Sequence, residues 1–263
     1  MAKSKSDTAT AFDRLVEIMR TLRAPDGCPW DREQDARSLR PYVLEEAYEV
    51  VQAIDDEDAD GLAGELGDLL LQIVFHSQLA EEKGEFDIEA VITGICEKLI
   101  RRHPHVFGDG KAETPREVRE RWEMLKLEER GGGSAVDDMP AALPALATAE
   151  KLGRRAAQVG FDWREVTDVL EKVREETNEL ELDLREMGTD ARRDKHVEEE
   201  LGDLLFSVSN LARHLGMSPE VALRRANEKF ERRFRAIEQR IPADGSMQIE
   251  QMDELWEEVK RGE

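Results

Sequence analysis

Aromatic residues and cysteines are scarce in this sequence, and each shortage excludes a class of protein. Aromatic residues make up 5% of the chain, so a sheet built on aromatic and β-branched side chains is disfavoured. The two cysteines, Cys28 and Cys96, are far apart and form no C-x-x-C pair, which argues against a zinc site. The first ten residues lack a signal-peptide core, and the most apolar stretch, 69–75, is too short to cross a bilayer. We therefore expect a cytoplasmic protein with no membrane partner.

The charge of the chain is strongly one-sided. Sixty acidic residues face 38 basic ones, which gives a formal net charge of −22. Such a protein repels polyanions, so no nucleic-acid partner is expected. With 40% hydrophobic residues the chain still favours a folded globular protein over disorder. A small anionic ligand remains compatible if metal ions and a few local cations neutralise it.

Apolar residues recur with the period of a helix, and no stretch alternates like a strand. The pattern predicts helices over 12–23, 38–55, 58–83, 87–103, 114–130, 140–158, 164–187, 190–215, 218–240 and 248–261. Thr114-Pro115-x-Glu117 has the residues of a helix cap, a proline at the first helical position and a capping box. The run Gly131-Gly132-Gly133-Ser134 predicts a linker. We expect an all-α protein with a module at 1–130, a linker at 131–139 and a second module at 140–263.

The two halves of the chain resemble each other. Four motifs recur in the same order, at offsets of 130, 135, 131 and 134 residues. They are L-E-E-A-Y-E at 44–49 with R-E-E-T-N-E at 174–179, G-E-L-G-D-L-L-L at 64–71 with E-E-L-G-D-L-L-F at 199–206, E-K-L-I-R-R at 97–102 with E-K-F-E-R-R at 228–233, and W-E-M-L-K at 122–126 with W-E-E-V-K at 256–260. This regularity indicates a tandem duplication of one helical module.

The repeated acidic residues predict a metal site in each module. In the second copy, Glu176 and Glu179 share one helix face, and Glu200 and Asp203 share a face of the next helix. If the two helices pack antiparallel, the four carboxylates converge on one groove and require cations, and oxygen ligands suit Mg2+ or Mn2+. A solvated acidic face is the alternative; the leucines beside the acids and the repetition of the pattern weaken it. The corresponding set in the first copy is Glu46, Glu49, Glu65 and Asp68.

Other metal enzymes fit the sequence less well. A di-iron bundle uses Glu-x-x-His pairs, and none of the five histidines has a glutamate three residues before it. The chain also lacks the G-x-x-x-x-G-K-[ST] motif of P-loop enzymes.

Cations and tryptophans form a second repeated pattern. Pairs spaced by four residues are suited to gripping phosphate oxygens or to stacking on a base with a lysine one turn away. The phosphate pairs are Lys229 with Arg233 and Lys98 with Arg102, and the stacking pairs are Trp256 with Lys260 and Trp122 with Lys126. The alternative is that both tryptophans are core anchors and both lysines are solvated. Together with the metal sites, the pattern favours a nucleoside polyphosphate as ligand.

These motifs resemble the MazG family of all-α nucleoside triphosphate pyrophosphatases. The family's signature, E-E-x-x-E followed by E-x-x-D, is present in both halves. The resemblance also includes C-P-W-D at 28–31, R-R-H-P-H-V-F-G at 101–108 and L-A-R-H-L-G-M-S at 211–218. The layout of two modules is similar to the full-length bacterial form.

The resemblance implies a Mg2+-dependent enzyme that hydrolyses NTPs and dNTPs to the monophosphate and pyrophosphate, and a homodimer whose subunits complete each other's bundles. It assigns the metal ligands to Glu176, Glu179, Glu200 and Asp203, and in the first copy to Glu46, Glu49, Glu65 and Asp68. It assigns the phosphate and base contacts to Lys172, Lys229, Arg233 and Trp256, with Lys260 as an addition. Beside the ligands, Glu175 is a candidate for orienting the water or the nucleotide.

The two copies differ one turn before their acidic residues. Lys172 and His196 precede Glu176 and Glu200, whereas Tyr42 and Gly61 occupy the equivalent positions of the first copy. The second groove is richer in possible phosphate contacts, so we expect it to be the main catalytic site. Two alternatives remain open: a nucleotide-binding sensor with little turnover, and a structural bundle whose acids are solvated.

Overall fold

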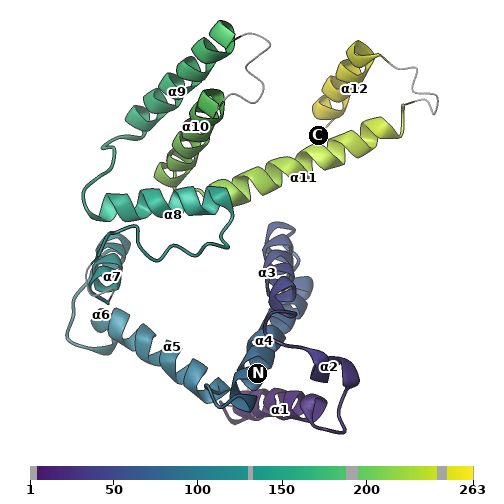
Figure 1. Cartoon of the computed structure of the whole chain (residues 1–263), viewed down its shortest axis with the longest axis vertical. Helices are drawn as coiled ribbons and strands as arrows, with labels where there is room; N and C mark the ends of the chain where they lie inside the picture. The colour runs from purple at the N-terminus through teal and green to yellow at the C-terminus, as the bar shows by residue number, and fades with distance from the viewer. Residues whose placement is uncertain (1–4, 130–132, 188–194, 242–247, 263) are drawn as a thin grey trace. The chain divides into compact units, whose positions relative to one another are not determined.

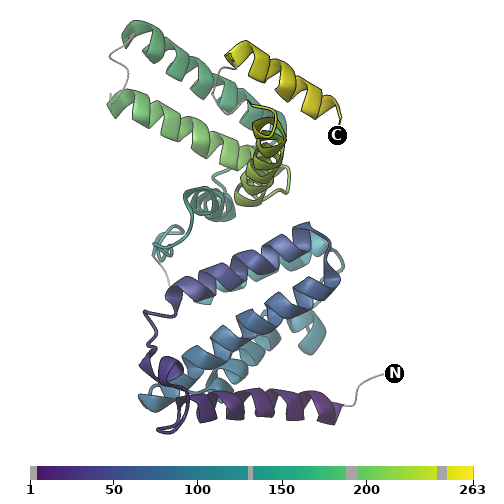
Figure 2. The same cartoon turned by 90° about the vertical axis from the view of Figure 1, so that its right-hand side faces the viewer.

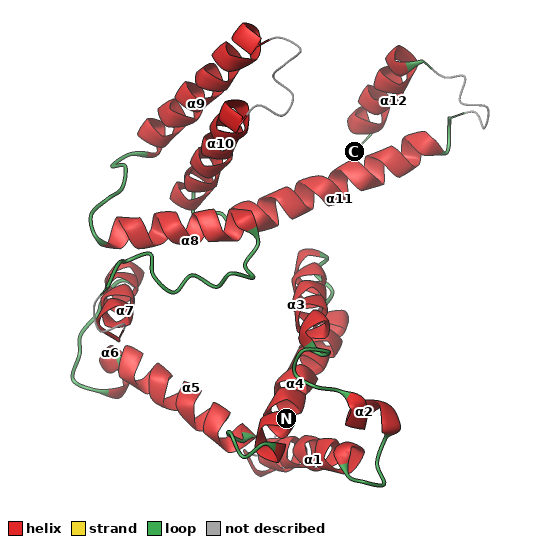
Figure 3. Cartoon of the chain, viewed as in Figure 1, coloured by secondary structure: helices red, strands yellow, loops and turns green. Residues whose placement is uncertain are grey.

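Helices account for the regular structure of the chain. The structure is a computed structural model that describes residues 5–129, 133–187, 195–241 and 248–262. Within these ranges every regular element is a helix and none is a strand (Figure 3). The all-α class expected from the sequence is therefore confirmed.

The helices agree with the predicted ranges apart from a few ends. They are α1 (Lys5–Arg23), α2 (Pro29–Glu33), α3 (Arg40–Asp55), α4 (Ala59–Glu82), α5 (Ile88–Arg102), α6 (Pro104–Phe107), α7 (Pro115–Glu129), α8 (Ala145–Gln158), α9 (Val166–Met187), α10 (Lys195–His214), α11 (Pro219–Glu238) and α12 (Ile249–Arg261) (Figure 1). The short helices α2 and α6 are not in the prediction, since neither is long enough to show a period. The prediction of helix at 140–144 is wrong: the chain there carries Pro140 and Pro144, and α8 begins after the second. The predicted start at 190–194 lies outside the described residues.

The chain divides into two compact units, residues 1–118 and 119–263. The division falls within α7, and the module boundaries expected from the sequence stay a prediction. No helix in the described ranges is both long and apolar enough to span a membrane.

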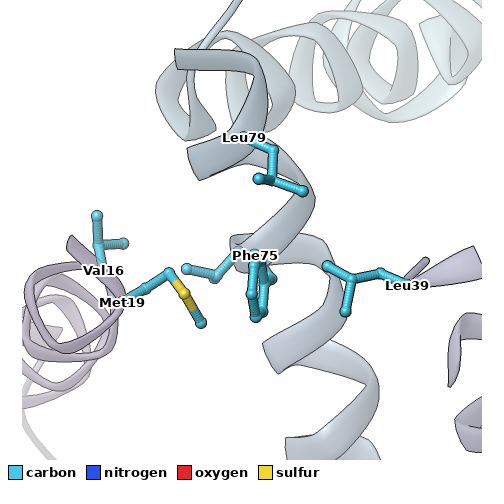
Figure 4. Packing of buried hydrophobic residues seen from close by; sticks show 6 residues of the cluster. Val16, Met19, Leu39, Phe75 and Leu79 are labelled. Carbon is cyan, nitrogen blue, oxygen red and sulfur yellow. The ribbon is translucent and has the colours of Figure 1, made fainter. Parts of the chain in front are cut away.

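The first unit is built around α4, which packs against α1, α3 and α5. Its core joins Val16 and Met19 of α1 to Phe75 and Leu79 of α4, with Leu39 closing the cluster just before α3 (Figure 4). This face of α4 leaves the stretch around Glu65 free to pair with α3. The core therefore fixes α4 while its neighbouring face carries the acidic residues.

The second unit is built around the pair of α9 and α10, which run side by side (Figures 1 and 2). Helix α8 crosses α10 closely at Gly153, where a Cβ atom would lie 2.2 Å from Oδ1 of the buried Asn210. Ser209 Oγ also donates a hydrogen bond to the Leu146 carbonyl, 3.3 Å away. Helix α12 packs on α11, and α11 contacts α8 and α10. These contacts make α10 the central helix of the unit.

A polar clamp fixes the loop before α9 to the end of α10. The Asp162 carboxylate accepts hydrogen bonds from both terminal nitrogens of Arg213, at 2.5 and 3.0 Å. Asp162 Oδ1 is also 2.9 Å from His214 Nε2. Burial raises the pKa of Asp162, but the hydrogen bonds from Arg213 and His214 outweigh it and the pKa lies below its ordinary value. The clamp thus helps to position α9 against α10.

Candidate metal and nucleotide site

Three carboxylates of the second unit converge between α9 and α10. One oxygen atom from each of Glu176, Glu179 and Glu200 lies within 4.8 Å of the other two. Glu176 and Glu179 are one turn apart on α9, and Glu200 faces them from α10, as the antiparallel pairing predicted. Glu176 is only 5% exposed. Desolvation, followed by repulsion from the Glu176 carboxylate, raises the pKa of Glu179 above its ordinary value. The group is therefore a concentrated and partly buried negative charge.

Lys172 places a positive charge next to this group. Its Nζ atom lies 2.8 Å from Glu175 Oε1 and 2.7 Å from Glu176 Oε1. Hydrogen bonds to Glu175 and then to Glu176 raise the pKa of Lys172 further above its ordinary value. The lysine is one turn before Glu176 on α9, where the sequence placed a phosphate contact. The ammonium group of Lys172 can neutralise these carboxylates. When a metal cation takes that role, the ammonium group can neutralise an anionic ligand instead.

The other acidic candidates lie at the edge of the group. Asp203 is exposed and is not among the three residues that meet within 4.8 Å. Glu175 is exposed as well, and its Oε1 atom is paired with Lys172. The structure thus brings together three of the four predicted metal ligands and places Glu175 beside them.

A second group of possible ligands adjoins the first. One ligand atom from each of Asp183, His196 and Glu200 also lies within 4.8 Å of the other two. Asp183 is not among the ligands predicted from the sequence, because it lies outside the repeated motif. Its signal was the spacing, since it follows Glu176 by seven residues and Glu179 by four on the same face of α9.

Apart from Lys172, the predicted phosphate and base contacts of this unit lie on a different pair of helices, α11 and α12. The Arg233 guanidinium of α11 lies over the Trp256 ring of α12, 5.8 Å from its centroid. The Phe230 ring is 5.2 Å from the same tryptophan. Lys229 is exposed on α11, and Lys260 Nζ is 3.3 Å from Glu257 Oε1. Trp256 therefore packs on α11, and α12 has its main packing partner in α11 rather than in the acidic pair of helices.

The first unit repeats the acidic group without the lysine. One oxygen atom from each of Glu46, Glu49 and Glu65 lies within 4.8 Å of the other two, across α3 and α4. Desolvation, followed by repulsion from Asp68, raises the pKa of Glu46. Desolvation, followed by repulsion from Glu49, raises the pKa of Glu65. Asp68 itself is exposed beside the group. Tyr42 occupies the position in this unit that Lys172 has in the second.

The remaining candidates of the first copy are spread over α5 and α7. Lys98 is exposed and Arg102 half-buried, both on α5. Trp122 is half-buried on α7, in the part of that helix assigned to the second unit. The side chain of Lys126 lies outside the described part of the structure.

The two units share one arrangement, in which a pair of helices brings three carboxylates together. This defines a duplicated all-α protein whose carboxylate groups could each hold a metal ion. Residues 34–107 and 164–237 both match the MazG nucleotide pyrophosphohydrolase domain, so the match covers more than half of the chain. The chain belongs to the MazG nucleotide pyrophosphohydrolase family. This confirms the resemblance, the duplication and the enzyme class expected from the sequence.

Two relatives that match over nearly their whole length carry this kind of name. The chain is 51% identical to the nucleoside triphosphate pyrophosphohydrolase of Escherichia coli K12, over 96% of this chain and 98% of that protein. It is 46% identical to the nucleoside triphosphate pyrophosphohydrolase/pyrophosphatase MazG of Thermotoga maritima, over 96% of both chains. It is 45% identical to an uncharacterized protein of Bacillus subtilis, over 96% of this chain and 52% of that protein. The names of the first two relatives support nucleoside triphosphate pyrophosphohydrolase activity for the chain.

Proposed function

We propose that the chain is a Mg2+-dependent nucleoside triphosphate pyrophosphohydrolase that releases pyrophosphate from NTPs and dNTPs, and that the second unit is its main catalytic site. The observation that carries the proposal is the group of Glu176, Glu179 and Glu200 with Lys172 beside it. The first unit has a similar acidic group but Tyr42 in place of the lysine. The second unit therefore combines cation ligands with a lysine that is paired to one of them.

The residues of this group fit a divalent cation. Their ligand atoms are carboxylate oxygens, which Mg2+ and Mn2+ prefer. Three carboxylates this close repel one another, and Lys172 balances only part of their charge. A cation held by Glu176, Glu179 and Glu200, with Asp203 at the edge, would neutralise charge on the triphosphate and activate water.

The protein's own groups complete the reaction. Lys172 lies beside the carboxylates, where its ammonium can move from Glu176 to a phosphate oxygen of the bound nucleotide. Glu175 is exposed next to it and is the candidate for orienting the water that attacks the α phosphorus. The bond between the α phosphorus and the oxygen that bridges it to the β phosphorus then breaks, and pyrophosphate leaves with that oxygen. Lys229 and Arg233 stabilise the leaving charge, Trp256 holds the base, and Lys260 provides a further contact.

We further propose a homodimer, because exposed apolar side chains line the helices next to the site. On α10 they are Leu201, Leu205 and Val208, and on α11 they are Leu223, Phe230 and Phe234. Rows of this kind are typical of helix faces that pack in a bundle. A second copy of the chain would cover them and bring α11 and α12 of one subunit to the acidic groove of the other. We also propose that the protein is cytoplasmic, and its net charge of −22 argues against a nucleic-acid partner.

Product analysis tests the proposed bond cleavage. ATP and dGTP are incubated with the full chain and Mg2+, and the products are separated by ion-exchange chromatography. We expect the monophosphate and pyrophosphate in equal amounts. Diphosphate and orthophosphate as first products would contradict attack at the α phosphorus. Bound nucleotide that is recovered intact would favour the alternative, a nucleotide sensor with little turnover.

A further inference from the structure

The acidic groove of the second unit extends one turn beyond the three carboxylates of the proposed site. Asp183 continues the face of α9 that carries Glu179, and His196 continues the face of α10 that carries Glu200. Because α9 and α10 form an antiparallel pair, these two extensions meet at the same end of the groove. An imidazole and a carboxylate therefore lie next to Glu200 on its far side from Glu176.

The imidazole of His196 lies between the two carboxylates, with a different ring nitrogen nearest to each, and one of these nitrogens can bind a cation together with them. Asp183 Oδ2 lies 3.5 Å from His196 Nε2, and His196 Nδ1 lies 3.8 Å from Glu200 Oε1. Bonds of about 2.1 Å place neighbouring ligand atoms roughly 3.0–3.5 Å apart and opposite ones roughly 4.2 Å apart. One atom from each residue lies within 4.8 Å of the others, so small side-chain rotations suffice.

The side chain of Asp183 is mostly buried, and the His196 ring that lies 3.5 Å from its Oδ2 atom makes no hydrogen bond to it. The Asp183 side chain is 18% exposed, and its Oδ2 atom is buried with no hydrogen-bond partner among the described residues. A buried carboxylate oxygen without a hydrogen bond is costly, and a cation removes that cost. His196 is 59% exposed, so water can reach the open side of the group and complete the coordination.

The first unit cannot form the same group. Ala53 and Gly61 occupy the positions equivalent to Asp183 and His196. At Gly61 a Cβ atom would lie 2.3 Å from Oδ2 of Asp58, whose carboxylate caps α4. A histidine there would disrupt that cap. The additional ligands are therefore a property of the second unit.

We propose that Asp183, His196 and Glu200 form a second divalent-cation site, which shares Glu200 with the first. The imidazole nitrogen makes the site better suited to Mn2+ or a similar transition-metal ion than to Mg2+, which prefers oxygen ligands. The role of this second cation beside a triphosphate rests on the proposed function, but the binding of the metal does not.

Manganese binding to the metal-free full chain tests the site directly. Free Mn2+ is measured by electron paramagnetic resonance during a titration, and pulsed spectra of the bound ion are examined for coupling to a nitrogen nucleus. We expect the wild type to show imidazole coupling, and His196→Gln to lose both that coupling and one bound Mn2+ per chain. Asp183→Asn should also lose one Mn2+.

Glu199→Gln is the matched control. Glu199 Oε2 lies 3.9 Å from His196 Nδ1. The variant therefore removes one negative charge close to the site, as Asp183→Asn does, without removing a ligand of the group. It should keep both the coupling and the Mn2+ count of the wild type. Nitrogen coupling that is absent from the wild type, or that survives in His196→Gln, would overturn the second site.

The two proposals fail in different ways. Pyrophosphate release by a wild type that lacks imidazole coupling would refute the second cation site and leave the proposed function standing. Imidazole coupling in a protein that hydrolyses no nucleotide would do the reverse.

Discussion

Replacing Lys172 with methionine should strengthen metal binding and weaken catalysis. Lys172 Nζ lies 2.7 Å from Oε1 of the buried Glu176, so a cation entering the group must break this ion pair. A hydrogen bond to a charged group contributes about 1.5–3 kcal/mol. The lysine side chain is 33% exposed, and solvent screening favours the lower end of that range. A gain of about 1.4 kcal/mol corresponds to roughly tenfold tighter binding.

Turnover should change in the opposite direction. If Lys172 moves from the carboxylate to a phosphate oxygen, its loss removes a charge-assisted contact in the transition state. We expect kcat/KM to fall by about tenfold or more, which corresponds to at least about 1.4 kcal/mol. Mg2+ affinity is measured by calorimetry without nucleotide, and turnover by pyrophosphate release.

Arg174→Met is the control for this prediction. Arg174 is exposed on the same helix, two residues from Lys172 and therefore on a different face. Its replacement by methionine removes one positive charge, as Lys172→Met does. It should leave both Mg2+ affinity and turnover close to the wild type. Weaker Mg2+ binding by Lys172→Met would refute the competition between the lysine and the cation.

Three further outcomes follow from the structure. In the metal-free protein, the pKa values of Glu46 and Glu65 are raised, so folding favours their protonated forms. Their contribution to the free energy of unfolding is therefore complete below the ordinary pKa of 4.5. It is lost as the pH rises through the pKa values of the folded state. Calorimetry should therefore show a smaller loss of Tm as the pH rises above 4.5 for the Glu46→Gln, Glu65→Gln double variant, and an unchanged loss would contradict this. Asp162→Asn should lower the free energy of unfolding at neutral pH by about 2 kcal/mol. Since the pKa of Asp162 is depressed, the difference between variant and wild type should shrink as the pH falls through the pKa of the folded state. A variant with the Tm of the wild type at pH 7 would refute a stabilising role for the contacts of Asp162 with Arg213 and His214. Light scattering should give about twice the chain mass of 30.0 kDa, and Leu205→Asp, at a side chain that is 50% exposed, should yield a monomer; a wild-type monomer with full activity would rule out the dimer.

Local periodicity is sufficient to predict the helices and the acidic pairs. Residues three or four apart share a helix face, which is why Glu176 and Glu179 meet Glu200 as expected. The same rule does not fix how far each face turns toward its partner. Asp203 therefore lies at the edge of the group, whereas Asp183, outside the repeated motif, faces the histidine.

The nucleotide half of the site depends on packing between helices that are distant in sequence. The spacing of Arg233 on α11 and of Trp256 on α12 predicts a face for each, but not which helix that face meets. In the structure the two side chains meet each other. Their predicted place beside the carboxylates requires a contact that no pattern within one helix can specify. The short helices α2 and α6 were missed because four or five residues do not display a period.

The most direct test of the catalytic assignment compares the same substitution in the two acidic groups. Glu176→Gln and Glu46→Gln each remove one negative charge with little change in shape, and both proteins must retain the helical circular dichroism of the wild type. Pyrophosphate release from an NTP with Mg2+ should fall about a hundredfold or more for Glu176→Gln, or roughly 3 kcal/mol, and should largely persist for Glu46→Gln. Loss of turnover in Glu46→Gln alone would move the catalytic site to the first unit, and full turnover in both variants would contradict catalysis by the carboxylate groups.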